Sequence, residues 1–385
     1  MSTKRLKITI VGGGPVGLFL GISLSHLGIA CTILEKRTTA VQDSRSLGIH
    51  PISMELFEKL SITDSFLNKG LKIQKGIAHD GSRKLGEIDF SILNKPFNYI
   101  LACPQFETEK ILSAEFIKMN PSGLVKGAEV HAIYQENKDE VICRYTLDGS
   151  EHSLKSDFII GCDGKNSFVR QEAGIFYGGK RYSDTYIMGD FEDNTDFGEK
   201  AAVFLPKQGM IECFPLPNRK RRWVVKTDNF VKNPSQKDLS DLVASRLDYD
   251  LSNIESTMLS SFGVQHFMAE QFVKDRILLC GDSAHVVSPI GGQGMNLGWI
   301  GAWKLSNALY MVQKKPSPKN YLIEYQKSQK KLVKKAARRA EMNMILGRGQ
   351  RLPIIKKMIV FLLLKTPLRK VAAQQFTMKN LISIN

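Results

Sequence analysis

The chain has 385 residues, of which 43% are hydrophobic and 24% are charged, a composition that predicts a globular protein of one large or two smaller domains. No segment reaches the roughly 18 to 20 uninterrupted apolar residues that span a bilayer, and the N-terminus lacks a signal peptide's apolar region, so we expect a cytoplasmic protein. The formal net charge of +16 does not indicate nucleic-acid binding, because much of the excess lies in one helical stretch, residues 314–341, and in the tail beyond it. We interpret this charge as a solvated helix face, with steering of an anionic substrate or nucleotide as the alternative.

The cysteines and histidines form no metal-binding pattern. The six cysteines are scattered without CxxC spacing, and most lie in apolar, strand-like runs, so we expect reduced thiols. The seven histidines include no HxxxH or HxH pair, and none is spaced from a cysteine as metal ligands are. The sequence therefore predicts no metal site.

A strand-helix-strand pattern opens the chain. Residues 6–11 form a short apolar run, residues 18–27 fit a buried helix, and residues 31–34 form a second strand. A GxGxxG motif lies at the turn between the first strand and the helix: Gly12, Gly14 and Gly17. In this motif the first glycine permits a tight bend, the second lets a pyrophosphate approach the backbone, and the third lets the helix pack on the strand.

The residues around this motif strengthen the prediction of a dinucleotide site. Pro15 and Val16 begin the helix, whose N-terminal amides would face the phosphates. Glu35 ends the second strand, where an acid accepts a hydrogen bond from a ribose 2′-hydroxyl, and Lys36 follows it. The acid favours a free 2′-hydroxyl, and hence FAD or NAD over NADP.

Two later segments repeat the design of a strand followed by an acid. Asp163 and Gly164 follow an apolar strand, and Gly281-Asp282 follows another one. After the second comes a loop with Pro289 and a glycine cluster that leads into a helix. A nicotinamide-binding domain has no use for this second acid and GGQG loop, whereas a cofactor with a long polyol and a flat ring system does. The sequence therefore favours FAD.

These three motifs, in this order, resemble the fingerprints of the single-component FAD-dependent aromatic monooxygenases of the p-hydroxybenzoate hydroxylase type. The resemblance implies an α/β (α+β) fold, with a glutathione-reductase-like Rossmann FAD-binding domain, an interleaved β-sheet substrate domain and a C-terminal helical segment. We expect residues 1–72, 100–175 and 265–330 in the FAD-binding domain, residues 73–99 and 176–264 in the substrate-binding sheet domain, and residues 331–385 in the C-terminal helices.

The resemblance also implies roles for single residues. Asp282 is expected to accept hydrogen bonds from the ribityl hydroxyls, and Pro289 to line the flavin face where oxygen reacts. The residues expected along the pyrimidine edge of the flavin are Gly292, Gln293, Gly294, Met295 and Asn296. Backbone amides stabilise a reduced, anionic flavin there only if no Cβ holds the ring away.

Other positions carry over from the family in the same way. Arg45 is expected near the FAD ring or phosphates, Gln105 at the ribityl chain, and Asp163 with Gly164 at FAD and NAD(P)H. The chain departs from the family at Gly301, where the family pattern GxxDA has an aspartate. This departure puts a helix contact near Gly301 in doubt.

The chemistry implied by the resemblance is monooxygenation. NAD(P)H would reduce FAD, O2 would add to it as a C4a-hydroperoxide, and one oxygen atom would pass to an aromatic or polyketide-like small molecule by hydroxylation or epoxidation. The flavin carries this chemistry, so no protein nucleophile or base is expected. Candidate substrate contacts, each with a structural or core role as the alternative, are His50, Met188, Phe204, Met210 and Phe214.

Several alternatives stay open. The chain could be an FAD-dependent reductase or dehydrogenase of a prenyl or other lipid-like substrate, or a catalytically silent FAD-binding partner of a pathway enzyme. A flavin halogenase is disfavoured because the WxWxIP-type signature is absent. The apolar run of residues 358–364, between lysines, predicts docking on the core, with weak contact to a membrane surface as the alternative. The sequence does not predict an oligomeric state.

Overall fold

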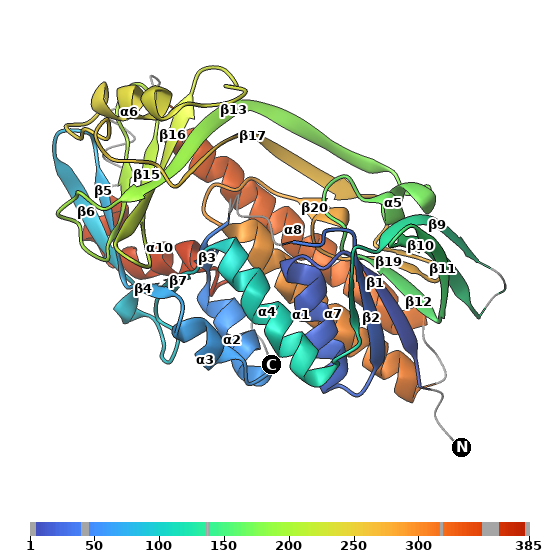
Figure 1. Cartoon of the computed structure of the whole chain (residues 1–385). Coiled ribbons are helices and arrows are strands. Elements are labelled where there is room, and N and C mark those ends of the chain that lie inside the picture. The colour runs from blue at the N-terminus through green and yellow to red at the C-terminus, as the bar shows by residue number, and fades with distance from the viewer. Residues whose placement is uncertain are drawn as a thin grey trace.

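The computed structural model describes residues 5–39, 46–135, 137, 139–315, 319–348 and 362–381. Its sheets and helices form the mixed α/β fold that the sequence predicts (Figure 1). Among these residues, no helix is long and apolar enough to cross a membrane.

A six-stranded sheet underlies the N-terminal glycine motif. In spatial order its strands are β18 (Val273–Lys274), β19 (Ile277–Leu279), β12 (Phe158–Gly161), β1 (Lys7–Val11), β2 (Ala30–Glu35) and β8 (Leu124–Lys126). The pairs β19–β12, β12–β1, β1–β2 and β2–β8 are all parallel. The carboxyl ends of these strands therefore meet at one edge of the sheet, which is where ligands bind in open α/β folds. Glu35 and the segments after Val11, Gly161 and Leu279 lie at this edge.

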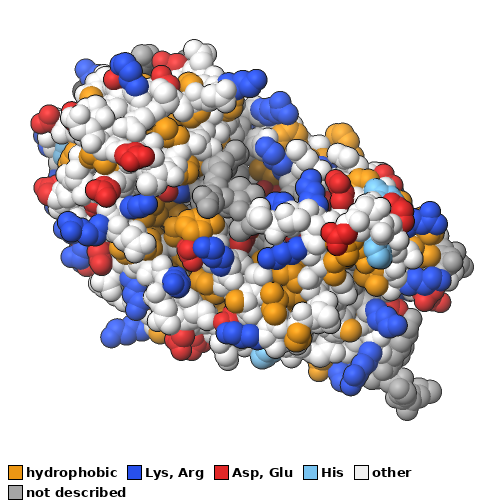
Figure 2. Space-filling model, in the orientation of Figure 1, with side chains coloured by type: hydrophobic (Ala, Val, Ile, Leu, Met, Phe, Trp, Pro, Cys, Tyr) orange, Lys and Arg blue, Asp and Glu red, His pale blue; other side chains and the backbone are white. Residues whose placement is uncertain are grey.

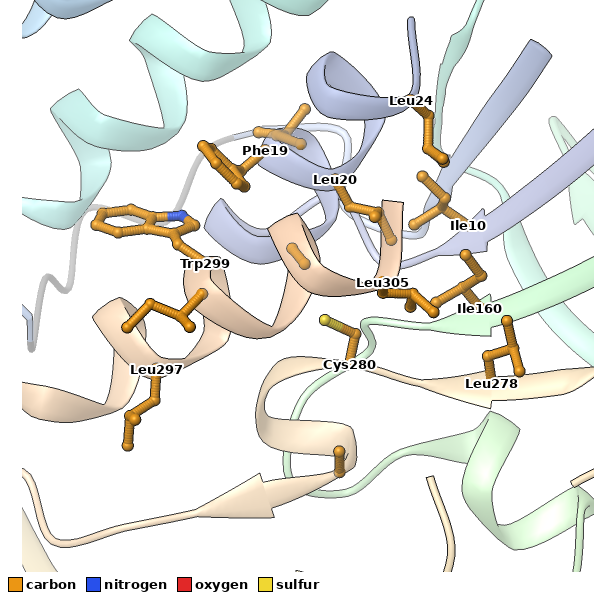
Figure 3. Close-up of a cluster of buried hydrophobic side chains, with 14 of the residues drawn as sticks. Ile10, Phe19, Leu20, Leu24, Ile160, Leu278, Cys280, Leu297, Trp299 and Leu305 are labelled. Carbon is orange, nitrogen blue, oxygen red and sulfur yellow. The ribbon is translucent and has the colours of Figure 1, made fainter. Parts of the chain in front are cut away.

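Helices cover this sheet: α1 (Pro15–His26), α4 (Gln105–Met119), α7 (Gln293–Lys314) and α8 (Lys319–Gly347). Figure 3 shows Leu20 of α1 and Leu305 of α7 beside Ile10 and Ile160 of the strands. Trp299 of α7 is fully buried, and its indole Nε1 donates to the Pro15 carbonyl at 3.0 Å. These contacts hold the starts of the two helices together.

A mixed eight-stranded sheet forms the other large layer. Its strands in spatial order are β20 (His285–Val286), β17 (Met258–Ala269), β13 (Tyr177–Glu192), β16 (Lys220–Thr227), β15 (Ile211–Leu216), β14 (Ala201–Phe204), β5 (Lys75–His79) and β6 (Lys84–Asp89). The long strands β13 and β17 run from this sheet towards the six-stranded sheet (Figure 1). Because β20 follows directly after the Gly281-Asp282 turn, the two sheets adjoin there.

Smaller elements complete the described chain. Two three-stranded sheets are formed by β11 (Ser150–Ser156), β10 (Val141–Leu147) and β9 (Glu129–Gln135), and by β3 (Gly48–Ile49), β7 (Ile100–Ala102) and β4 (Leu71–Ile73). The short helices are α2 (Pro51–Lys59), α3 (Thr63–Leu67), α5 (Phe168–Glu172), α6 (Gln236–Ala244), α10 (Arg369–Phe376), η1 (Phe90–Ile92) and η2 (Gly281–Ser283).

The apolar run near the C-terminus falls only partly within the described chain. Residues 358–361 lie outside the described residues. Leu364, at the end of the run, is buried with Ile88, Phe90 and Ala373 in a small hydrophobic cluster. The end of the run therefore packs against β6 and α10, whereas the side chain of Leu362 is exposed.

Candidate active site

One large cavity connects the two sheets. It has a volume of about 1760 Å³ and is lined by the strand-end loops of the six-stranded sheet and by a face of the eight-stranded sheet. A hollow lies between these two parts of the molecule in Figure 2, with hydrophobic side chains on its rim. The volume exceeds the ~300 to 1,000 Å³ of an ordinary small-molecule pocket, so it can hold a dinucleotide and a second ligand together.

The glycine motif forms a cradle at one end of the cavity. Gly12 has φ of +106°, and a Cβ there would lie 2.5 Å from the Cys162 carbonyl oxygen. A Cβ on Gly17 would collide with the Gly12 carbonyl oxygen, so Gly17 packs inside the turn and does not line the cavity. A Cβ on Gly14 would meet no atom within 4 Å, because this position opens into the cavity with Pro15 and Val16. This open approach to the backbone at the start of α1 fits a pyrophosphate.

Glu35 lies beside the cradle and is held by a small polar network. Its Oε2 accepts from the Gly13 amide at 2.6 Å, and its Oε1 accepts from Arg37 Nε at 2.8 Å. Burial alone would raise the pKa of Glu35, but the hydrogen bonds from Arg37 and Gly13 outweigh burial and lower it. The side chain is therefore a fixed carboxylate at the position expected for the ribose contact.

The network continues towards the predicted ribityl contact. Arg37 also pairs with Glu109 at 3.4 Å, and Gln105 Nε2 donates to the other Glu109 oxygen at 3.0 Å. Arg37 and Glu109 line the cavity together with Lys36 and Gln105, although the sequence motif singled out only the last two. The signal for Arg37 was available in its position two residues after the strand-ending acid. Arg45 lies outside the described residues, so its predicted contact stays a prediction.

Asp163 follows the neighbouring strand end. Its Oδ2 accepts from the Val169 amide at 3.0 Å, whereas its buried Oδ1 has no partner among the described residues. Burial raises the pKa of this carboxyl group. Asp163 and Gly164 both line the cavity.

Hydrogen bonds from neighbouring side chains fix the turn that carries Asp282. Ser283 Oγ donates to the carbonyl oxygens of strand ends β12 and β19, at Gly161 and Cys280. Arg170 donates to the Ser283 carbonyl at 2.9 Å, and Tyr177 Oη donates to the Asp282 carbonyl at 3.0 Å. The backbone of this turn is therefore fixed by neighbours on both sides.

The Asp282 carboxylate itself projects into the cavity. It is exposed there, yet the surrounding protein removes enough water to raise its pKa to about 6, with the charge of Lys165 acting in the opposite direction. A polyol that donates hydrogen bonds to this carboxylate would replace the lost water.

The loop before α7 presents backbone to the same cavity. Pro289, Gly292, Gly294 and Met295 line it. Gly292 caps α7 in the left-handed conformation, with φ of +64°, and no side chain of the described residues caps the helix. The first amides of α7 are therefore free to face an anionic ligand.

Two residues of the predicted flavin edge have a different location. Gln293 is 2% exposed and does not line the cavity, and neither does Asn296. Asn296 Oδ1 accepts from the His50 amide at 2.9 Å and from Ser53 Oγ at 2.7 Å. Its Nδ2 donates to the carbonyls of Gly48 at 2.9 Å and Gly292 at 2.8 Å. The Asn296 side chain is thus fully used in clamping the loop to β3 and α2, and only its backbone is left for a flavin.

The predicted substrate contacts divide into two groups. His50, Met188, Met210 and Phe214 line the cavity. His50 is 2% exposed, and burial lowers its pKa to about 4, so the imidazole is neutral at pH 7. Phe204 does not line the cavity, so the structure corrects its prediction as a substrate contact.

The alternation of strand β14 explains this correction. Its neighbours Val203 and Leu205 face the cavity, so Phe204 faces the opposite side of the sheet. There its ring packs near Trp223 and Tyr249 in a separate core, with ring centroids 6.3 Å apart in both pairs. Phe204 is therefore a core residue.

The parallel sheet, the glycine cradle, the acids at three strand ends and the start of α7 together define a Rossmann-type nucleotide-binding fold whose cavity extends along a second sheet. The chain belongs to the FAD binding domain family, whose model matches residues 5–340.

Similar proteins agree with this assignment. The chain is 30% identical over 314 residues to the uncharacterized aromatic compound monooxygenase YhjG of Bacillus subtilis (strain 168), covering 79% of this chain and 62% of that protein. It is 27% identical over 337 residues to pentachlorophenol 4-monooxygenase of Sphingobium chlorophenolicum, covering 83% and 60%. The chain therefore spans less than two thirds of the length of these curated relatives.

A solved structure has the same fold over its whole length. The crystal structure of p-nitrophenol 4-monooxygenase PnpA from Pseudomonas putida DLL-E4 superposes with a TM-score of 0.89 at 19% identity, covering 99% of both chains. At this identity, the likeness concerns the fold alone.

Proposed function

We propose that the protein is an FAD-dependent monooxygenase that consumes NAD(P)H and O2 and inserts one oxygen atom into an aromatic or polyketide-like small molecule. The observation that carries this proposal is one continuous cavity, which joins the glycine cradle to an apolar sheet wall. The relatives support the reaction class, because their names describe monooxygenases of aromatic compounds.

Each end of the cavity has its own task in this proposal. The amides at Gly14 and the start of α1 bind the pyrophosphate, while Glu35 and Asp282 accept hydrogen bonds from the ribose and the polyol. Pro289 and the Gly292–Met295 backbone would hold the ring system, and the amides of α7 would stabilise negative charge on it. When bound and reduced by NAD(P)H, FAD supplies the oxygen-activating chemistry.

The protein contributes position and a dry environment in this proposal. The chamber wall is built mainly from apolar residues such as Met188, Val203 and Val224, which exclude water from the reacting atoms. His50 is neutral and contacts the substrate as a hydrogen-bonding group, not as a cation. The predicted division of the chain into an FAD domain, a substrate domain and C-terminal helices matches these tasks, and we retain it as part of the proposal.

The experiment is to purify the protein, record its flavin spectrum, and screen phenols for those that accelerate NAD(P)H oxidation. A substrate should show O2 consumption and a product heavier by one oxygen atom. NAD(P)H oxidation with substrate reduction and no mass gain would indicate a reductase or dehydrogenase, and a yellow protein that oxidises no NAD(P)H with any ligand would indicate a silent partner. A protein that stays colourless with added FAD would end the whole proposal.

A further inference from the structure

The carboxylate of Glu212 is an unexplained group on the wall of the ligand chamber. Glu212 lies on β15, is 8% exposed and lines the cavity. Among the described residues its carboxylate forms no hydrogen bond and no ion pair. Buried carboxylates in proteins are normally paired, because removing a charge from water without a partner is costly. A partner from outside the chain would satisfy it.

The immediate neighbours of Glu212 are apolar. In the sheet register Glu212 pairs with Val203 on β14 and with Val224 on β16, and Val224 pairs with Met188 on β13. Residues paired directly across strands share one face of the sheet, and all of these line the cavity. Glu212 is therefore a single polar group within an otherwise apolar patch.

This patch adjoins the loop that we assign to the flavin ring. Ile290, the residue after Pro289, is buried in the same hydrophobic cluster as Met188, Met210 and Val224. A ligand on the patch thus lies between Glu212 and the Pro289 loop, the position of a substrate in the proposed function.

The other ionisable groups near this face do not neutralise Glu212. Asp190 is paired with Arg222 at 2.6 Å, and Arg348 is paired with Asp184. The Tyr186 hydroxyl interacts electrostatically with Glu212, but it is buried and has no hydrogen-bond partner among the described residues. Two further charged side chains of this region have partners of their own: Lys226 donates to the Thr227 carbonyl, and Glu341 pairs with Lys180. Burial raises the pKa of Glu212 to about 7, so it titrates in the physiological range.

We propose that Glu212 is a specificity-determining residue that accepts a hydrogen bond from an O–H or N–H group of the aromatic substrate and selects against substrates with a carboxylate at that position. This inference rests on the proposed function, because it takes the chamber to be the substrate site. A phenolic hydroxyl supplies the partner that the chain does not, and a hydrogen bond to an ionised acceptor is strong in a dry site. A substrate carboxylate would instead meet a like charge.

The test compares three probes that share one ring. 4-Methoxyphenol carries one hydroxyl donor, 1,4-dimethoxybenzene carries none, and 4-methoxybenzoate carries a negative charge. Each is titrated into the FAD-loaded protein, and its Kd is taken from the change in the flavin absorption spectrum. The variants are E212L, which removes the acceptor, and E212Q, which keeps a neutral one. E129Q is the control, because Glu129 also lines the cavity but is exposed and lies on β9, away from the sheet wall.

We expect the wild-type protein to bind 4-methoxyphenol about tenfold more tightly than 1,4-dimethoxybenzene, the effect of one hydrogen bond to a charged group. The preference should grow from pH 6 to pH 8, because the ligand donates to the ionised carboxylate. E212L should lose the preference, E212Q should keep part of it without the pH dependence, and E129Q should match the wild type. If E212L does not retain FAD, the pH dependence of E212Q decides.

Three outcomes would overturn the inference: an unchanged hydroxyl preference in E212L, wild-type binding of 4-methoxybenzoate as tight as that of 4-methoxyphenol, or no spectral change with any probe. The proposed function fails separately. Glu212-dependent binding of the phenol without oxygenated product from any phenol would support this inference and contradict the monooxygenase.

Discussion

Asn296 gives the sharpest test of how the loop before α7 is held. Its side chain is fully buried and makes four hydrogen bonds of 2.7 to 2.9 Å, which join α7 and its capping Gly292 to β3 and α2. At about 1 kcal/mol for each bond, N296A should lower the free energy of unfolding by about 4 kcal/mol. N296D should cost at least as much, because it places carboxylate oxygens against the carbonyls of Gly48 and Gly292.

The matched control is N307A on the same helix. Among the described residues, Asn307 makes one side-chain hydrogen bond, to the Trp303 carbonyl at 2.7 Å, so its removal should cost only about 1 kcal/mol. Urea unfolding of both variants and the wild type, followed by tryptophan fluorescence at one saturating FAD concentration, measures the difference. Equal shifts of the unfolding midpoint in N296A and N307A would refute the clamp, and with it the assignment of Asn296 as a structural residue.

Three further predictions test the glycine cradle, the carboxylate of Asp282 and which face of β14 lines the cavity. G14A should keep its melting temperature but bind FAD more weakly, because the new Cβ enters only the cavity. G17A should instead be destabilised, because its new Cβ collides with the Gly12 carbonyl. Melting curves and FAD titrations separate the two effects, and a G17A variant as stable as the wild type would contradict the packing of Gly17. The pKa of Asp282 is raised to about 6, against ~3.9 in the unfolded chain, so the folded protein binds an extra proton between these pH values and loses stability as pH rises through them. D282N should therefore stabilise the FAD-free protein at pH 8 but not at pH 4, and should weaken FAD binding. An equal gain in stability at both pH values would exclude this cause. V203A should change the Kd of aromatic probes with little effect on the melting temperature, because Val203 lines the cavity. F204L should lower the free energy of unfolding by about 1 kcal/mol and leave probe binding unchanged. The reverse pattern would place Phe204 in the chamber.

The strand-end positions were predictable because parallel strands place their carboxyl ends at one edge. Gly12, Glu35, Asp163 and Asp282 are separated by up to 270 residues, yet each follows or ends an apolar strand, and the sheet brings those ends together. The local pattern of an apolar strand followed by an acid or glycine is enough to predict these positions, because the parallel topology places the strand ends together.

Which residues of β14 face the cavity could not be predicted from the sequence, and the reason is physical. The sheet is covered on one side by a hydrophobic core that includes Leu239 and Val243 of α6, and on the other by the apolar chamber. The strand sequence AAVF is consequently apolar throughout, and no alternation of polar and apolar residues marks which face is which. The structural role of the Asn296 side chain was not predictable either, because its partners Gly48, His50 and Ser53 lie more than 240 residues earlier in the chain.

Helix α8 shows how the chain compensates for its departure from the family pattern at Gly301. A Cβ at this position would lie 2.9 Å from Gln329 Nε2, so the end of the Gln329 side chain occupies the space that a side chain at position 301 would need. Gln329 is fully buried there, donates to the Leu297 carbonyl at 2.9 Å, and lies 3.4 Å from His285 Nε2. A polar side chain thus reaches this place from α8 instead of from α7.

The same face of α8 docks on the edge of the six-stranded sheet. Tyr325 Oη donates to the Leu279 carbonyl at 2.8 Å, and Gln326 Oε1 accepts from the Phe272 amide at 2.7 Å. Five cationic side chains of this helix are exposed: Lys327, Lys331, Lys334, Lys335 and Arg338. The sequence of α8 suggests a charged surface helix, yet three of its uncharged polar residues support the strand end before Asp282 and the helix α7, which we propose faces the flavin.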